Sequence, residues 1–145
     1  MRFVPIPTPR TGQAVEDTEL WKTRAHWMPF MPRIAARSDE TLGELIDHVR
    51  SGRVQLGVVF DTETQTTHAV IGMVYRILGR EHVGEVHWVT GWGAKDWQHL
   101  LPQLEKYLKE HKGCTKIKPI CRPGWQPLLK VHGYKRTHVM MEKRL

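Results

Sequence analysis

Long apolar stretches are missing from this sequence. No run approaches the roughly 18 consecutive apolar residues that a membrane-spanning helix needs. The N-terminal segment MRFVPIPTPR also lacks the apolar core and the small-residue cleavage site of a secretory signal. These two absences argue against a membrane or secreted protein, and we expect a cytoplasmic location.

Cysteine is scarce, because Cys114 and Cys121 are the only two. Two cysteines are too few for a disulfide framework, and their spacing matches no common zinc or redox motif. The nine histidines include no pair with the HxxxH or HExxH spacing of a helical metal site. We therefore expect no bound metal, and two small buried cysteines in a reduced compartment.

Acidic residues are few in the C-terminal third of the chain. The formal net charge of the 145 residues is +7, and residues 95–145 carry 12 Lys and Arg against 4 Asp and Glu. Such a basic surface can face nucleic acid, bind the phosphates of a nucleotide-like cofactor, or keep the protein soluble. The lysines through which nucleic acid would bind are Lys106, Lys109, Lys112, Lys116 and Lys118.

The length of the chain suits one compact domain with a real core. Its first residues place Pro5, Pro7 and Pro9 at alternate positions, which fixes the backbone and removes hydrogen-bond donors. This pattern predicts an extended N-terminal arm over residues 1–12, rather than a strand or helix, that docks on a partner. We expect residues 13–145 to form the single domain.

Hydrophobic periodicity predicts the elements of that domain. The clearest helix begins near Lys95, where apolar side chains recur at helical spacing, and Pro102 is expected to loosen its first turns. The predicted helices are 14–28, 38–52, 95–113 and 123–132, and the predicted strands are 54–61, 68–78, 84–91, 114–122 and 134–145. The three strands that follow the first two helices would form an antiparallel meander, so the predicted order is α-α-β-β-β-α-β-α-β.

That order resembles the N-acetyltransferase (GNAT) fold after its first strand. In the GNAT family a loop that binds the pyrophosphate of acyl-CoA follows a strand and opens a helix. Its pattern is Arg or Gln, two residues, Gly, one residue, then Gly or Ala. The segment WVTGWG matches it with Gly91 and Gly93, and it has Trp88 in place of the polar first residue.

A second segment, LLKVHGY, carries the resemblance further along the chain. It is similar to the leucine, tyrosine and glycine-aromatic signature of the family through Leu128, Gly133 and Tyr134, and Leu129 stands where the family has its tyrosine. The segment RPGWQPLL and the C-terminal residues MEKRL also resemble small GNAT-like proteins of tailed bacteriophages, and this resemblance covers roughly residues 40–145.

The resemblance implies a fold, a cofactor and a place for that cofactor. The fold would be α/β (α+β), with a GNAT-like mixed and mostly antiparallel sheet flanked by about four helices. Acetyl-CoA would lie in a V-shaped opening between the WVTG strand and CTKIKPICR. The residues that would bind it are Val89, Gly91, Trp92, Gly93, Ala94 and Lys95.

Acyl transfer also needs a base for the amine and an acid for the departing thiolate. Glu85 and His87 lie two residues apart and therefore share one face of the predicted strand, beside the expected acyl site. They would act as the base, or they belong to an ordinary solvated sheet face. Leu129 cannot donate a proton, so His132 or Tyr134 would replace the family's tyrosine as acid, and Tyr134 is also a candidate for packing in the core.

Two functions follow from the resemblance, and a third from the charge. The first is an acetyl-CoA-dependent N-acetyltransferase acting on an amine. The alternative is a catalytically inactive GNAT-fold phage protein, a virion or host-interaction component with a phage or host protein as partner, located in the host cytoplasm or the virion. The third is nucleic-acid binding through the basic C-terminal third, which would make affinity strongly dependent on salt.

Overall fold

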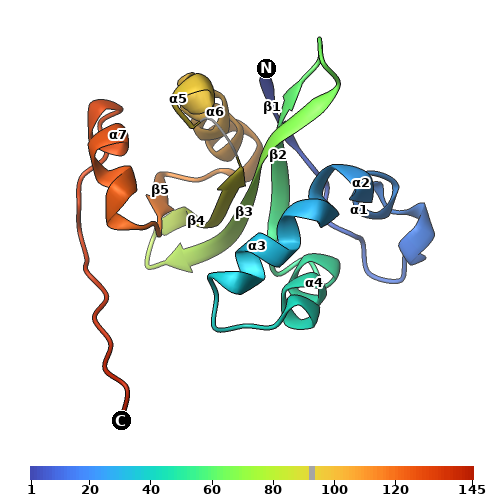
Figure 1. The fold of residues 1–145 in the computed structure, drawn as a ribbon, viewed down its shortest axis with the longest axis horizontal. Coiled ribbons are helices and arrows are strands. Elements are labelled where there is room, and N and C mark those ends of the chain that lie inside the picture. Colours follow the sequence, from blue (N-terminus) through green and yellow to red (C-terminus); the bar gives the residue numbers. More distant parts are fainter. Residues whose placement is uncertain (92–93) are drawn as a thin grey trace.

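The computed structural model describes residues 1–91 and 94–145, and it is built around one five-stranded sheet (Figure 1). Neighbouring strands follow the chain order β1-β2-β3-β4-β5. Strands β1 to β4 pair antiparallel, and β5 runs parallel to β4. The bounds are Arg2–Pro5 for β1, Gln55–Asp61 for β2, Thr66–Leu78 for β3, Glu81–Gly91 for β4 and Lys116–Pro119 for β5. The prediction of a mixed, mostly antiparallel sheet is confirmed.

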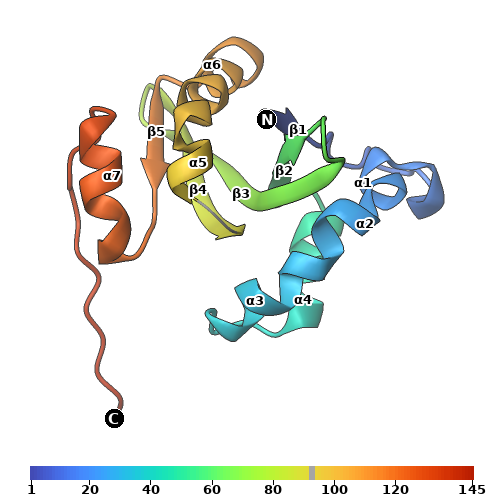
Figure 2. The ribbon, with the colours of Figure 1, turned by 45° about the horizontal axis from the view of Figure 1, so that its top comes forward.

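Helices cover both faces of this sheet (Figure 2). One face carries α1 (Glu19–Lys22), α2 (Arg24–Trp27), α3 (Met31–Ala36) and α4 (Leu42–Arg50). The other carries α5 (Ala94–Trp97) and α6 (Leu101–Lys112), with α7 (Gln126–Val131) beside them and next to β5. Single 3-10 turns lie at Val15–Asp17, Met28–Phe30, Gln98–Leu100 and Pro123–Trp125. Within the described residues, no helix is long and apolar enough to cross a membrane.

The two helix layers create two apolar cores, one on each side of the sheet. Successive strand residues point to opposite faces, so Val58 and Val70 belong to the α1–α4 core, while their neighbours Val59 and Ile71 belong to the α5–α6 core. This double burial explains why the central strands are continuously apolar.

The predicted N-terminal arm contains a strand instead. Within residues 1–12, Arg2–Pro5 forms β1 at the edge of the sheet, with Phe3 opposite Val59. An edge strand tolerates proline because one side of it needs no donor. The Phe3 ring is buried over Gly57, where a Cβ atom would collide with it. The expectation that this segment is not a strand was wrong.

Two prolines at or just beyond the end of the predicted helix 14–28 begin new helical turns. Pro29 lies in the 3-10 turn Met28–Phe30, and Pro32 lies in the first turn of α3. Proline is tolerated there because the N–H that it lacks would have no partner inside the helix. The predicted helix 14–28 is therefore divided into a 3-10 turn, α1 and α2, and α3 follows directly.

The long helix behaves as its sequence predicts. It starts as α5, is interrupted by the 3-10 turn Gln98–Leu100, and continues as α6, which has Pro102 in its first turn. Gly113 takes a left-handed conformation (φ 64°) and ends it. The loosening at Pro102 is confirmed.

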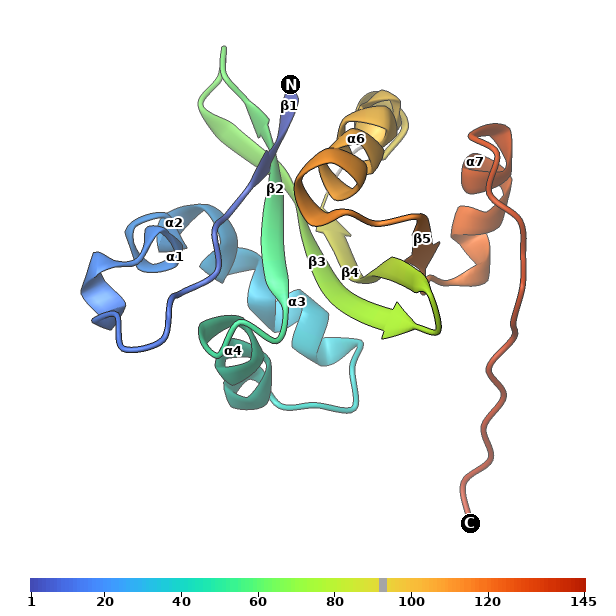
Figure 3. The same cartoon turned by 180° about the vertical axis from the view of Figure 1, so that it is seen from behind.

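The predicted final strand is absent. Residues 135–145 are exposed, and the segment extends away from the rest of the chain (Figure 3). Its start is anchored on α6, because the Tyr134 hydroxyl donates to Glu105 Oε1 at 3.2 Å. Alternation of side chains produces a strand only where another strand supplies backbone partners, and the described residues supply none here. Cys121, just beyond β5, is also exposed, whereas Cys114 is buried as expected.

Candidate functional site

The parallel pair β4 and β5 separates halfway along β4. Pairing ends with Val86 opposite Pro119, after which the Ile120 amide donates to the Val86 carbonyl at 2.9 Å. From His87 to Gly91, β4 is bonded only to β3 among the described residues. This half of β4 has an open backbone edge that faces away from β3.

A β-bulge marks the point where the opening starts. On β3, Met73 pairs with Val86 and Gly72 pairs with Trp88, which leaves His87 as the extra residue of β4. A bulge re-aims the side chains that follow it. Val86 and Val89, three residues apart, consequently pack on the same α5–α6 face.

Trp88 is turned to the opposite face by the same bulge. Its side chain packs against the α1–α4 core and lies over Gly72, where a Cβ atom would come within 2.5 Å of Trp88 Cε3. Trp125, in the 3-10 turn before α7, packs with its ring 5.9 Å from that of Trp97. Both rings therefore have packing partners in the cores.

Glu85 and His87 form a polar pair at the bulge. His87 Nε2 lies 2.9 Å from Glu85 Oε1, and the same oxygen accepts from Arg76 Nε at 2.5 Å. Arg76 was not predicted as a site residue. In the β3–β4 hairpin it stands opposite Val83 while Glu85 stands opposite Val74, so the two charges are diagonal neighbours. The hairpin register is the signal that identifies it.

The hydrogen bonds determine the electrostatics of this pair. Burial raises the pKa of the Glu85 carboxyl, but the hydrogen bonds from His87 and Arg76 outweigh burial, and the net pKa lies below its ordinary value. Glu85 is therefore an ionised acceptor at neutral pH. An ionised acceptor requires a proton on His87 Nε2, which leaves Nδ1 of a neutral ring as a proton acceptor.

Replacing Arg76 with alanine is expected to destabilise the fold at neutral pH but not in acid. Because the folded-state pKa of Glu85 lies below its ordinary value of 4.5, ionised Glu85 stabilises the fold above that pH, and the stabilisation is lost as the pH falls through the folded-state pKa. The Arg76 side chain is 52% exposed, so the loss at pH 7 is expected to be at most about 1 kcal/mol. Urea unfolding at pH 7 and at about pH 3 measures it.

The matched control is Arg80→Ala, which removes an exposed arginine from the same hairpin. It is expected to leave the free energy of unfolding unchanged at both pH values. Equal losses for the two variants, or a loss for Arg76→Ala that persists in acid, would contradict the assigned ion pair.

The predicted cofactor-binding residues lie where β4 ends and α5 begins. Gly91 ends β4 opposite Ala69, and a Cβ atom there would collide with the β3 backbone at His68, so only glycine fits. Lys95 is exposed in the first turn of α5, and Ala94 is the first residue of that helix. Two further predicted residues, Trp92 and Gly93, lie outside the described residues.

The open end of β4 also contains an unsatisfied polar group. Thr90 is 5% exposed, and its Oγ1 has no hydrogen-bond partner among the described residues. Buried hydroxyl groups normally have partners. The unpaired backbone of β4 and this hydroxyl together fit an extended polar ligand lying along β4.

The arrangement of these elements decides the fold. The structure has the GNAT fold. A crystal structure of a probable acetyltransferase matches with a TM-score of 0.68 at 11% identity, over 100% of this chain and 97% of that chain. Glucosamine-6-phosphate N-acetyltransferase from Arabidopsis thaliana matches with a TM-score of 0.61 at 13% identity, over 99% of both chains. Ribosomal-protein-alanine N-acetyltransferase from Brucella melitensis biovar Abortus 2308 matches with a TM-score of 0.63 at 9% identity, over 86% of this chain and 94% of that chain.

These similarities lie in the structures, because their sequence identities are low. No protein-family model matches the sequence, and no curated protein matches it either. The comparisons therefore establish the GNAT fold, and the chemistry has to be argued from the residues of this chain.

The predicted acid lies apart from the predicted base in this GNAT fold. His132 Nε2 is 3.3 Å from Gln98 Oε1, next to the α5–α6 core, whereas Glu85 on β4 bonds to Arg76 on the adjacent strand β3. Leu129, at the position of the family's tyrosine, is buried. The structure thus brings Glu85 and His87 together, and it joins His132 to a different element.

The hydroxyl groups of all three tyrosines of the chain form hydrogen bonds away from the Glu85–His87 pair. Tyr134 donates to Glu105, and burial together with that carboxylate raises its pKa well above the ordinary value. Tyr75 and Tyr107 both bond the buried side chain of Gln55. None of these hydroxyls replaces the tyrosine of the GNAT signature at the open end of β4.

Two lysines of the basic third have partners within the fold. Lys116 forms an ion pair with Glu81 at 2.7 Å, and the Lys112 ammonium lies 5.0 Å from the centre of the Tyr75 ring. No group of three His, Cys, Asp or Glu side chains that could hold a metal ion occurs in residues 1–91 and 94–145.

Proposed function

We propose that this protein is an acetyl-CoA-dependent N-acetyltransferase that acts on an amine. The observation that carries the proposal is the Glu85–His87 pair, which lies at the bulge where the open edge of β4 begins. A base must lie beside the bond that it helps to form. Acetyl-CoA lying along the open half of β4 would bring its thioester close to His87.

The residues around the opening offer binding groups of the right kinds. The backbone of β4 from His87 to Gly91 can hydrogen-bond the extended amide-containing arm of acetyl-CoA, as a neighbouring strand would. Thr90 Oγ1 supplies a buried hydroxyl without a partner in the described chain. Lys95, at the start of α5, supplies a positive charge for the phosphates. When bound, acetyl-CoA supplies an activated acyl group.

His87 would act as the general base in this reaction. Its Nδ1 takes the proton that the amine loses as the new carbon–nitrogen bond forms and the carbon–sulfur bond of the thioester breaks. Glu85 holds the other ring nitrogen and stabilises the imidazolium that results, and Arg76 keeps Glu85 ionised. The departing thiolate receives its proton from the imidazolium or from water, since the tyrosines are committed elsewhere.

Calorimetric titration with acetyl-CoA tests the binding half of this proposal. We expect saturable binding in the micromolar to millimolar range common for enzyme substrates. Lys95→Glu is expected to weaken it about tenfold by placing a negative charge near the phosphates. Lys106→Glu, the same change on the exposed side of α6, is the matched control and is expected to bind normally. No heat of binding, or equal affinities for the two variants, would count against the proposal.

A second candidate function is favoured by the buried Leu129 and the three committed tyrosines. In this alternative the protein keeps the GNAT fold but transfers no acyl group, and it acts through a protein partner. Its role as a phage virion or host-interaction component stays a prediction. Free CoA released from acetyl-CoA over a panel of primary amines distinguishes the two, because only the enzyme releases CoA in proportion to the amine added.

A further inference from the structure

A cavity of about 540 Å³ lies on the side of the molecule formed by the N-terminal segment, α1, α2 and α4. None of its lining residues belongs to β4, β5 or α5, so it is separate from the opening described above. Its volume is within the range of pockets that hold small organic molecules. Neither the proposed acyl transfer nor the packing of the sheet uses this space.

The inner walls of the cavity are apolar and aromatic. Trp27 is 1% exposed, and its Nε1 donates to the Leu20 carbonyl at 3.0 Å, so its one polar atom is already satisfied. At the rim, Val15 and Trp21 remain 37% and 38% exposed. Large apolar side chains at the mouth of a cavity favour a ligand with an apolar body. The apolar lining consists of Val15, Leu20, Trp21, Trp27, Met28 and Ile46.

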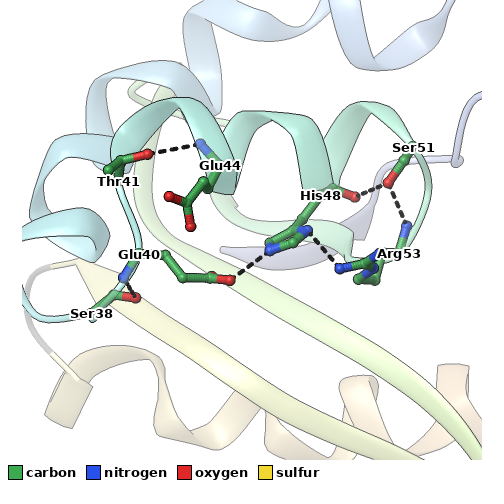
Figure 4. Close-up of polar contacts among 7 residues, drawn as sticks. All are labelled: Ser38, Glu40, Thr41, Glu44, His48, Ser51 and Arg53. Carbon is green, nitrogen blue, oxygen red and sulfur yellow. Dashed lines mark hydrogen bonds and ion pairs between the residues drawn. The ribbon is translucent and has the colours of Figure 1, made fainter.

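The rim of the cavity is positively charged. Arg10 and Arg50 both line it, and neither guanidinium group has a hydrogen-bond or ion-pair partner among the described residues. Asp47 is the carboxylate in the lining. Arg53, three residues beyond Arg50, instead contacts His48 Nδ1 at 3.3 Å, and His48 in turn bonds Glu40 (Figure 4). Arg50 is thus left available, while Arg53 is engaged with His48 in the last turn of α4.

The rim is also held in shape by its own hydrogen bonds. The backbone N–H of Gln13 donates to the backbone carbonyl of Arg10 at 3.1 Å, and Oε1 of the Gln13 side chain accepts from the backbone N–H of Arg10 at 3.1 Å. Gly12 has φ 81°, the left-handed conformation that this turn requires. The backbone that carries Arg10 is therefore set before any ligand arrives, which lowers the entropic cost of binding.

We propose that this cavity binds a small organic anion, a molecule with one carboxylate, sulfonate or phosphate group on an aromatic or aliphatic body. The body lies against Trp27 and Ile46, and the anionic group meets Arg10 and Arg50 at the rim. Guanidinium groups suit all three anions because they donate paired hydrogen bonds. The site is independent of the proposed acyl transfer.

Two fluorescent probes of nearly equal shape test both parts of this chemistry. The first is 8-anilinonaphthalene-1-sulfonate, which carries an anion, and the second is the neutral N-phenyl-1-naphthylamine. Titrated into the folded protein, the sulfonate is expected to bind about tenfold more tightly than the neutral probe. Circular dichroism and the Tm show that each variant below is folded. Excess acetyl-CoA is expected to leave the sulfonate bound, because the two sites are separate.

Two variants test whether the probes bind in the cavity. Arg50→Glu is expected to weaken the sulfonate about tenfold and to leave the neutral probe unchanged. Val15→Trp fills the mouth and is expected to weaken both probes. The matched control is Arg37→Glu, which changes an exposed arginine outside the lining. The proposal is overturned if folded Arg50→Glu and Val15→Trp bind both probes with the same affinities as the control Arg37→Glu. It is also overturned if acetyl-CoA displaces the sulfonate.

Discussion

Replacing His87 with alanine is expected to lower kcat for amine-dependent release of CoA by about 10²–10³-fold, the usual contribution of a general base. The ring is 30% exposed and bonded to Glu85 through Nε2, so it can reach a substrate through Nδ1 while its orientation is maintained. The KM for acetyl-CoA is expected to change little, since the ring acts on the amine. Steady-state release of CoA, measured with a thiol reagent, checks both values.

The control for this experiment lies on the same strand. His82→Ala removes an exposed histidine near the beginning of β4, and it is expected to keep full activity. Glu85→Gln keeps the shape of the side chain but removes the charge that stabilises the imidazolium, so its pH–rate profile is expected to shift along with the loss in kcat. Equal rates for His87→Ala and the unchanged protein would exclude His87 as the base.

Replacing Trp27 with alanine is expected to lower the free energy of unfolding by about 3–5 kcal/mol, the typical cost of truncating a buried aromatic side chain. Trp27 is 1% exposed in the α1–α4 core, where it joins α2 to the sheet. The variant would lose the contacts of the indole ring and its hydrogen bond to the Leu20 carbonyl. Urea unfolding followed by far-UV circular dichroism measures the change.

Trp21→Ala is the matched control, because it removes the same side chain six residues earlier in the chain. Trp21 is 38% exposed, and the Arg24 guanidinium lies 4.3 Å from its ring centre. Its loss is expected to cost about 1 kcal/mol or less. If the two variants were equally stable, Trp27 would not be the core residue that its burial indicates.

The candidate site shows where prediction from sequence reached its limit. Alternation along β4 placed Glu85 and His87 on one face, and the structure joins them by a hydrogen bond. Alternation could not place Trp88 and Val89, because the bulge at His87 reverses the faces of the residues after it. A bulge depends on the register with β3, which no short window of sequence specifies.

The same limit explains the strands at both ends of the chain. The alternate prolines Pro5, Pro7 and Pro9 argued against a strand in this segment, yet Arg2–Pro5 pairs with β2 because the edge of the sheet tolerates proline. Residues 134–145 alternate like a strand, but within the described residues no other strand pairs with them. In both cases the outcome depends on whether a segment far away in the sequence supplies a pairing strand, which the local sequence does not show.

The sequence by itself determined the kinds of elements and much of their order. The periods of β2, β3, β4, α4 and the long helix are local properties, because each reflects which face of one element is apolar. Only the tertiary structure decided that β4 separates from β5 after Val86, that Arg76 holds Glu85, and that arginines gather around a cavity beside Trp27. Those features depend on backbone pairing and packing between distant segments, and such contacts exist only once the chain has folded.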